Sequence, residues 1–133
     1  NNIWDAPPGS PGIEATTPIM LTAVNTGKIS IDRLISVMST TPAKLFNLFP
    51  KKGVLQVGSD ADIVILDMKS EYKLRSDHLH TKVKEGFLYD GWNVKGRPIL
   101  TIVRGKIVMD DGSIIEKPGW GKFLKPLPPG TGH

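Results

Sequence analysis

The residues that most clearly suggest chemistry in this sequence are two histidines, His78 and His80. On a strand they would point the same way, and two imidazoles placed in this manner can share a metal ion. A catalytic zinc ion is usually held by three protein ligands, however, and the flanking Ser76-Asp77 and Thr81-Lys82 form no further cluster. The remaining histidine, His133, is the last residue. We therefore predict that the pair binds no metal.

Other candidate sites are incomplete as well. Asp60, Asp62 and Asp67 are close enough in sequence to suggest calcium binding, but they lack the loop glycine and closing glutamate of an EF-hand. Turn and strand-edge roles are the better interpretation. The sequence has no Walker-type phosphate loop, no glycine-rich dinucleotide fingerprint and no cysteine, and its spacing favours no Ser-His-Asp arrangement. The residues alone therefore provide no complete catalytic site.

Composition excludes several classes of partner. The chain has 133 residues, 39% of them hydrophobic, with 11 prolines and 14 glycines, which predicts one modest core and many turns. Its net charge of +4 comes from scattered lysines without aromatic interleaving, so we expect no nucleic-acid partner. No apolar run approaches the ~18 residues that span a bilayer, and no signal-peptide pattern opens the chain. We expect a cytoplasmic protein with no membrane partner.

The elements that must position any site are arranged around residues 51–67. The unbroken apolar run Ile63–Leu66 predicts a strand buried on both faces, and the turn residues of 58–60 precede it. Gly53 supplies another turn, so Val54–Val57 is predicted to be a short strand before it.

Three helical segments are expected before this stretch. The first is predicted to begin at Thr17-Pro18, as N-cap and first helical residue, and to end at residues 25–27. Ser30 caps the second, which residues 39–41 are expected to interrupt before a short helix over 42–48. No strand is predicted between these helices, so they cannot cover a parallel sheet by themselves. We expect their apolar faces to be covered by a partner missing from this chain or by another copy of it.

Short strands dominate the remainder. Residues 71–74 are a candidate strand, and the aromatic and glycine residues of 86–96 are interpreted as packing against a sheet edge. Strands over 99–103 and 106–109 flank Arg104-Gly105, a hairpin signal, and a second turn leads to Ile114-Ile115. The sequence therefore predicts an antiparallel meander.

Both ends of the sequence are rich in proline. Residues 1–12 contain three prolines and two glycines, which predicts a loop of fixed shape. The tail over 116–133 is expected to be an extended arm that docks through Trp120 and Phe123, if it docks.

The first loop resembles a motif of a known enzyme family. Ala6–Glu14 is similar to the Ala-Pro-x-Gly-x-x-Gly-Leu-Glu segment that follows the last barrel strand in dihydroorotases of the amidohydrolase superfamily. Three later features follow in the family's order: Thr-Pro-Ala-Lys at 41–44, Lys-Gly at 52–53 and Gly-x-Asp-Ala-Asp at 58–62.

The resemblance implies an α/β architecture with an added β domain, of which this chain is only the C-terminal portion. Residues 1–50 would be the last loop and helices of a (β/α)8 metallohydrolase barrel. Residues 51–133 would be part of a small β-sandwich with an extended tail. The missing N-terminal barrel portion would then be the partner of the helices, and the exposed helix faces make a homo-oligomer an expectation too.

The resemblance also implies a reaction, the reversible cyclisation of carbamoyl aspartate to dihydroorotate. In the family, zinc held by upstream residues activates water, and an upstream Asp transfers the proton. Pro8 and Gly9 correspond to the positions whose backbone holds the substrate, although Pro8 has no N–H and only Gly9 can donate. No catalytic residue and no metal ligand is expected within this chain, so the isolated chain should be inactive.

Other members of the superfamily remain open as alternatives. Hydantoinases (dihydropyrimidinases) and allantoinases share the sandwich strands, and the Pro-Gly-Ile-Glu of 11–14 favours dihydroorotase over them. A rival of another class is a non-catalytic homologue with a structural or assembly role.

Overall fold

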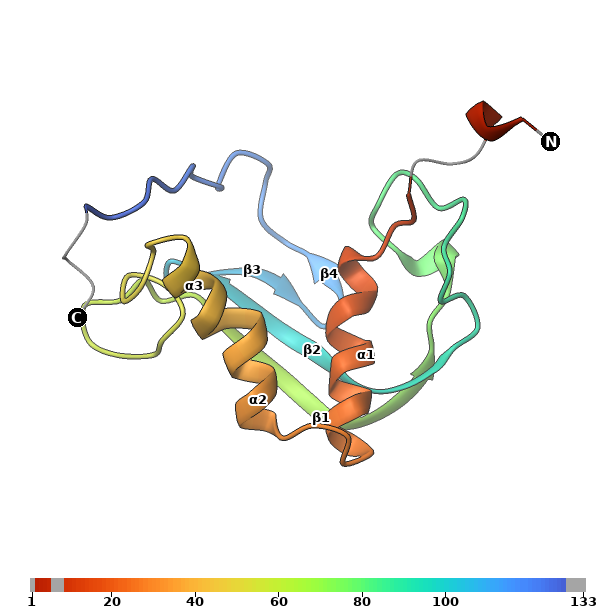
Figure 1. The fold of residues 1–133 in the computed structure, drawn as a ribbon, viewed down its shortest axis with the longest axis horizontal. Helices are drawn as coiled ribbons and strands as arrows, with labels where there is room; N and C mark the ends of the chain where they lie inside the picture. The colour runs from red at the N-terminus through yellow and green to blue at the C-terminus, as the bar shows by residue number, and fades with distance from the viewer. Residues whose placement is uncertain (1, 6–8, 129–133) are drawn as a thin grey trace.

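The fold consists of helical segments and one antiparallel sheet (Figure 1). A computed structural model describes residues 2–5 and 9–128. The helical elements are α1 (Ile13–Asn25), α2 (Ile31–Ile35), a π-helical segment (Ser36–Thr40), α3 (Thr41–Leu45) and two 3-10 turns (Ile3–Asp5 and Ser76–His78). The strands are β1 (Ile63–Lys73), β2 (Asn93–Val103), β3 (Lys106–Asp110) and β4 (Ser113–Ile114).

The sheet has the order β1-β2-β3-β4, with every neighbouring pair antiparallel. The β2–β3 hairpin turns at Arg104-Gly105, where both residues have positive φ, and the β3–β4 turn lies at Asp111-Gly112. These observations confirm the predicted antiparallel meander, although β2 begins at Asn93 and not at the predicted residue 99. β1 adds a further strand to this meander. The two predicted segments 63–66 and 71–74 belong to this single strand, which ends at Lys73, and its pairing with β2 shifts register between Asp67 and Glu71.

Helix α1 begins earlier than its sequence predicts. Its first residue is Ile13, and Pro18 lies inside the helix, so the predicted start at Thr17-Pro18 is wrong. The Gly12 carbonyl accepts hydrogen bonds from the amides of Ala15 and Thr16, which closes the first turn. Ala15 is fully buried in the core, and this burial favours a helical turn ahead of the proline.

Helices α2 and α3 are parts of one helical rod. Ser30 Oγ accepts a hydrogen bond from the Arg33 amide, which confirms the predicted cap. The predicted interruption at 39–41 is wrong, because the π-helical segment joins α2 directly to α3. Ser39, Thr40 and Thr41 therefore do not break the helix. The helical turn widens instead, and the Thr41 amide donates a hydrogen bond to the Ser36 carbonyl.

Residues 51–62 form turns, so the predicted strand at Val54–Val57 is wrong. Backbone and side-chain groups here bond to the helices and to each other: Thr40 Oγ1 donates to the Gly53 carbonyl at 2.9 Å, and Ser59 Oγ donates to the Pro50 carbonyl at 2.6 Å. Two lysines, Lys51 and Lys52, are ion-paired with Asp60, and Lys52 also pairs with Asp62.

The aspartates have the turn roles that were predicted for them. Asp62 Oδ1 accepts a hydrogen bond from the Arg104 amide at 2.8 Å, and Asp67 Oδ1 accepts one from the Lys69 amide at 2.8 Å. β1, in contrast, is not buried on both faces, since Val64 and Ile65 are 51% and 45% exposed among the described residues. An apolar run cannot indicate which of its faces the rest of the fold covers.

The core lies between α1, β2 and the loop that joins β1 to β2. Ala15, Leu74, Phe87 and Val94 form its buried cluster. Around it, Tyr89 makes edge-to-face contacts with Phe87 and Trp92, with ring centroids 5.8 and 5.2 Å apart. The aromatic residues of 86–96 therefore pack, as predicted. The predicted division of the chain at residue 50 stays a prediction.

Helix α1 approaches β2 most closely at Gly96. A Cβ at this position would lie 2.8 Å from Leu21 Cβ, and Leu21 is fully buried. Beside this contact, the Lys95 amide donates to Thr22 Oγ1 at 2.8 Å and Asn25 Nδ2 donates to the Lys95 carbonyl at 3.2 Å. The absence of a side chain at Gly96 is what allows the helix to reach the strand.

From β4, the C-terminal tail runs back toward the end of the molecule where α3 lies (Figure 1). The Trp120 indole N–H donates to the Val103 carbonyl at 3.1 Å, and its ring lies 4.8 Å from the Arg104 guanidinium and 4.7 Å from Lys106 Nζ. Phe123 is 91% exposed. The tail therefore docks through Trp120, as predicted, but not through Phe123.

Substitution of Gly96 by Ala should lower the free energy of unfolding by about 2–4 kcal/mol, from positive-φ strain and overpacking against Leu21. Gly91→Ala is the matched control, because Gly91 also has positive φ but no atom lies within 4 Å of its Cβ position. It should lose only about 1–2 kcal/mol. Urea unfolding measures both values; equal losses would show that the helix does not press on Gly96.

Substitution of Trp120 by Ala should loosen the tail around residue 120, because it removes the indole hydrogen bond and both cation contacts, while the hydrogen bond from the Leu127 amide to the Asn47 carbonyl remains. Trypsin should then cleave after Lys122 faster than in the wild type, as followed by mass spectrometry. Phe123→Ala should leave the cleavage rate unchanged, because that ring is exposed. A similar acceleration in both variants would argue against docking by Trp120.

Candidate functional site

The first predicted site residue, Pro8, lies outside the described residues. The second, Gly9, is exposed, and no atom other than those of its chain neighbours lies within 4 Å of the place that a Cβ would occupy. The backbone at Gly9 is therefore open to an approaching molecule, and its role in substrate binding stays a prediction.

The loop after Gly9 is tied to the segment between β1 and β2 by Ser10. The Ser10 hydroxyl donates to the Gly86 carbonyl at 2.7 Å and accepts from the Leu88 amide at 3.4 Å. Residues 86 and 88 flank the buried Phe87, so the hydroxyl is attached to backbone that the core fixes.

Glu14, in the first turn of α1, makes the second attachment. Its carboxylate accepts hydrogen bonds from the His80 and Thr81 amides, both at 2.9 Å, and Oε2 lies 3.1 Å from His80 Nδ1. Burial tends to raise the pKa of Glu14, but these amides and the His80 ring outweigh it, and the pKa is lowered from its ordinary value. The side chain is therefore an ionised acceptor at neutral pH.

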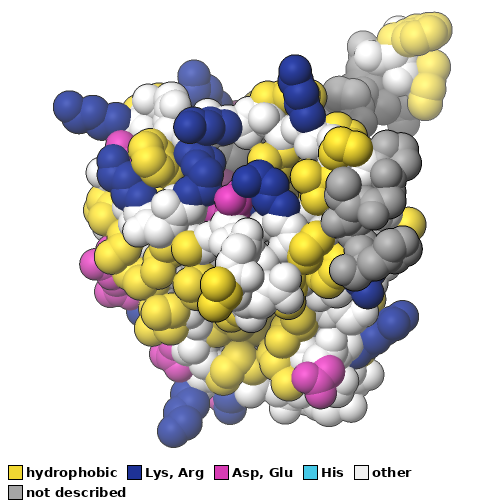
Figure 2. Space-filling view, turned by 90° about the vertical axis from the view of Figure 1, so that its left-hand side faces the viewer, with side chains coloured by type: hydrophobic (Ala, Val, Ile, Leu, Met, Phe, Trp, Pro, Cys, Tyr) yellow, Lys and Arg dark blue, Asp and Glu magenta, His cyan; other side chains and the backbone are white. Residues whose placement is uncertain are grey.

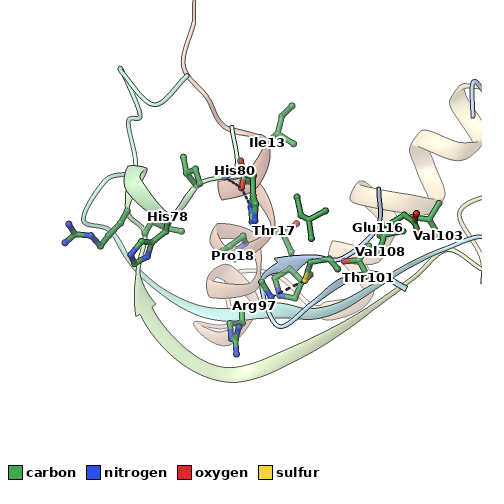
Figure 3. A pocket seen from close by; sticks show the side chains of 18 of the residues that line it. Ile13, Thr17, Pro18, His78, His80, Arg97, Thr101, Val103, Val108 and Glu116 are labelled. Atoms are coloured by element: carbon green, nitrogen blue, oxygen red, sulfur yellow. Dashed lines mark hydrogen bonds and ion pairs between the residues drawn. The ribbon is translucent and has the colours of Figure 1, made fainter. Parts of the chain in front are cut away.

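The two histidines are not arranged as a ligand pair. His78 ends a 3-10 turn and its Nε2 lies 3.9 Å from Asp77, whereas His80 faces Glu14 (Figure 3). Neither lies on a strand. Within residues 2–5 and 9–128, no three His, Cys, Asp or Glu side chains are grouped so that they could hold a metal ion.

A cavity of about 1070 Å³ opens between α1, the sheet and the tail (Figure 3). Its lining is mainly apolar, and it includes Thr17, Pro18, Tyr72, Arg97, Thr101 and Trp120. Burial raises the pKa of Tyr72, against the opposing charge of Arg97. The described lining contains no nucleophile paired with a base, so this space can hold an apolar group but does not itself suggest a reaction.

The sequence did not reveal the contacts of Ser10 and Glu14. Both lie in the motif of the first loop, but their partners are 66 to 78 positions away in the chain. An acidic residue three positions before the predicted helix start was the available signal, because carboxylates are favoured near helix N-termini.

The helices of the described residues are all too short or too polar to span a membrane.

Comparisons with known proteins give two groups of relatives. The chain is 43% identical to an L-hydantoinase of Paenarthrobacter aurescens, over 92% of this chain and 27% of that protein. It is 42% identical to a dihydroorotase of Pyrococcus furiosus, over 88% of this chain and 28% of that protein. The chain thus spans little more than a quarter of these relatives, and their names do not separate dihydroorotase from hydantoinase.

Solved structures match in the same way. A D-hydantoinase structure superposes with a TM-score of 0.88 at 38% identity, covering 95% of this chain and 27% of that one. An L-hydantoinase (dihydropyrimidinase) from Arthrobacter aurescens gives a TM-score of 0.88 at 42% identity, covering 93% and 28%. The helices and four-stranded sheet therefore correspond to part of a hydantoinase structure, which confirms the expected fold class in part.

The family model described as "Amidohydrolase family" matches residues 12–108. This span contains α1, the helical rod, β1, β2 and part of β3. Because the match covers most of the sequence, the chain belongs to the amidohydrolase family.

Proposed function

We propose that this chain is the C-terminal portion of a longer, metal-dependent cyclic amidohydrolase. The superposition on hydantoinase structures over 95% of the chain, at a TM-score of 0.88, is the observation that carries the proposal. Relatives named for cyclic amide chemistry, at 43% and 42% identity, support it. In the reaction, water adds to a ring carbonyl and the ring C–N bond breaks; ring closure is the reverse, with loss of water.

Gly9 has the binding role in this proposal. Its amide N–H donates a hydrogen bond to a carbonyl or carboxylate oxygen of the cyclic substrate. The exposed position and the open space around Gly9 support this role, because a main chain without a side chain lets a flat ring approach closely. Pro8 can contribute a carbonyl oxygen but no amide donor.

Dihydroorotate and carbamoyl aspartate are the substrates we propose first. The segment Ala6–Glu14, with its Pro-Gly-Ile-Glu, supports dihydroorotase. Hydantoins or dihydropyrimidines are the second candidate, supported by the 43% identity to an L-hydantoinase. All of these substrates contain a cyclic amide: hydantoin has a smaller ring than dihydroorotate, and dihydropyrimidines such as dihydrouracil have the same ring but lack its carboxylate.

The described residues do not fit a metal, since they include no group of three ligating side chains. We therefore assign the zinc and the proton-transfer group to the barrel portion of the intact protein, and the role of this chain's residues is limited to substrate binding. When bound there, zinc supplies an activated water.

The same barrel portion is the proposed partner of the helical rod. Ile35, Leu45 and Phe46 are 51%, 76% and 67% exposed, and hydrophobic side chains are spread over the face shown in Figure 2. Exposed apolar groups on a helix are typical of a surface that another part of the structure covers. Self-association into a homo-oligomer stays a prediction as well.

The isolated chain should not hydrolyse or form dihydroorotate, with or without added zinc, because it lacks a metal site among its described residues. The intact protein should turn over, and removal of its zinc by a chelator should abolish turnover reversibly. Ultraviolet absorbance of the ring measures both. Turnover by the isolated chain would contradict the proposal, and an intact protein without activity and without bound zinc would favour a non-catalytic homologue.

Substrate profiling of the intact protein separates the two candidate substrates. We expect kcat/KM for dihydroorotate to exceed that for hydantoin and dihydrouracil by about tenfold or more, the effect of one well-placed polar contact. A preference for hydantoin or dihydrouracil would show that the intact protein is a hydantoinase and not a dihydroorotase. Allantoin should be included, since allantoinase is a further alternative.

A further inference from the structure

Two side chains that follow Gly9 in the chain reach the same distant segment. Ser10 lies one residue after Gly9, and Glu14 follows at the first turn of α1. Among the described residues 9–14, these are the two whose side chains form hydrogen bonds to the segment between β1 and β2.

That segment is itself fixed to the core. Leu79 packs against the buried cluster, and Phe87 belongs to it. Both ends of the segment are bonded as well: the Leu74 amide donates to the Trp92 carbonyl at 2.9 Å, and the Ser76 amide donates to Asp90 Oδ1 at 2.7 Å. A loop that is hydrogen-bonded to this segment is therefore held in a fixed position relative to the core.

The two attachments use complementary chemistry. The Ser10 hydroxyl can donate and accept at the same time, so it donates to the Gly86 carbonyl and accepts from the Leu88 amide. The Glu14 carboxylate only accepts, and its two oxygens face two successive amides, at His80 and Thr81, so one residue fixes the direction of that backbone.

We infer that Ser10 and Glu14 are positioning residues that set the place of the Gly9 amide against the substrate by clamping the loop onto residues 79–88. This inference rests on the proposed function, in which Gly9 contacts the substrate. Neither side chain touches the reacting atoms. Displacement of a binding group by about 1 Å can cost on the order of a hundredfold in rate, so a clamp on this loop matters for substrate use.

The test uses the intact protein with Ser10→Ala and Glu14→Gln. Each variant should raise KM by about tenfold while zinc content and kcat change less, because the amide is displaced but the metal is not. Ser10→Thr keeps the hydroxyl and should restore a KM near that of the wild type. Hydrogen exchange should speed up at the His80 and Thr81 amides in Glu14→Gln, and at Leu88 in Ser10→Ala.

Two matched controls remove comparable contacts elsewhere. Ser59→Ala deletes a serine-to-carbonyl bond of 2.6 Å in another loop, and Glu71→Gln deletes a carboxylate that is ion-paired with Lys95 at 2.8 Å. Both should keep KM unchanged. If Glu14→Gln does not fold, Ser10→Ala and its Thr rescue carry the test.

The outcomes separate this inference from the function on which it rests. An active wild type whose Ser10 and Glu14 variants keep their KM would overturn the positioning role and leave the proposed function intact. A wild type inactive on every cyclic amide would overturn the proposed function, and the positioning role with it. A rise in KM in Ser59→Ala and Glu71→Gln as large as in the loop variants would show a general loss of structure, and would also overturn the inference.

Discussion

The contact between α1 and β2 is the constraint on which the rest of this structure depends. Gly96 has no side chain, so Leu21 can lie against the strand, and Thr22 and Asn25 then bond to the backbone of Lys95. The helix is thereby attached to the sheet by close packing and by directional hydrogen bonds together. Burial supplies most of the stabilisation, while the hydrogen bonds fix how far along the strand the helix sits.

The position of the first loop follows from that contact. Because α1 is fixed on β2, its first turn presents Glu14 to the amides of His80 and Thr81, and Ser10 reaches Gly86. The aromatic contacts of Phe87, together with Leu79, hold the receiving segment on the core. A chain of contacts therefore leads from the helix–sheet interface to the exposed backbone of Gly9.

The described part of the chain also has apolar surface that none of its own residues covers. Its buried hydrophobic residues are few and mostly near α1 and the sheet, whereas large apolar side chains of the helical rod are exposed. Small domains bury a limited share of their apolar surface. The chain spans about 27% of the relatives that it matches, and our proposal assigns the cover of this surface to the barrel portion of an intact enzyme.

The sequence alone determined the features that depend on neighbouring residues: the Ser30 cap, the turn at Arg104-Gly105, the antiparallel order of the strands around that turn and the motif from Ala6 to Glu14 that indicated the amidohydrolase superfamily. These signals are local, because caps and tight turns are set by a few adjacent side chains. Tertiary structure decided the start of α1 at Ile13, the turns at 54–57, the exposure of β1 and the separate surroundings of His78 and His80. Each depends on contacts with residues far away in the chain, and local patterns carry no information about which distant groups will meet.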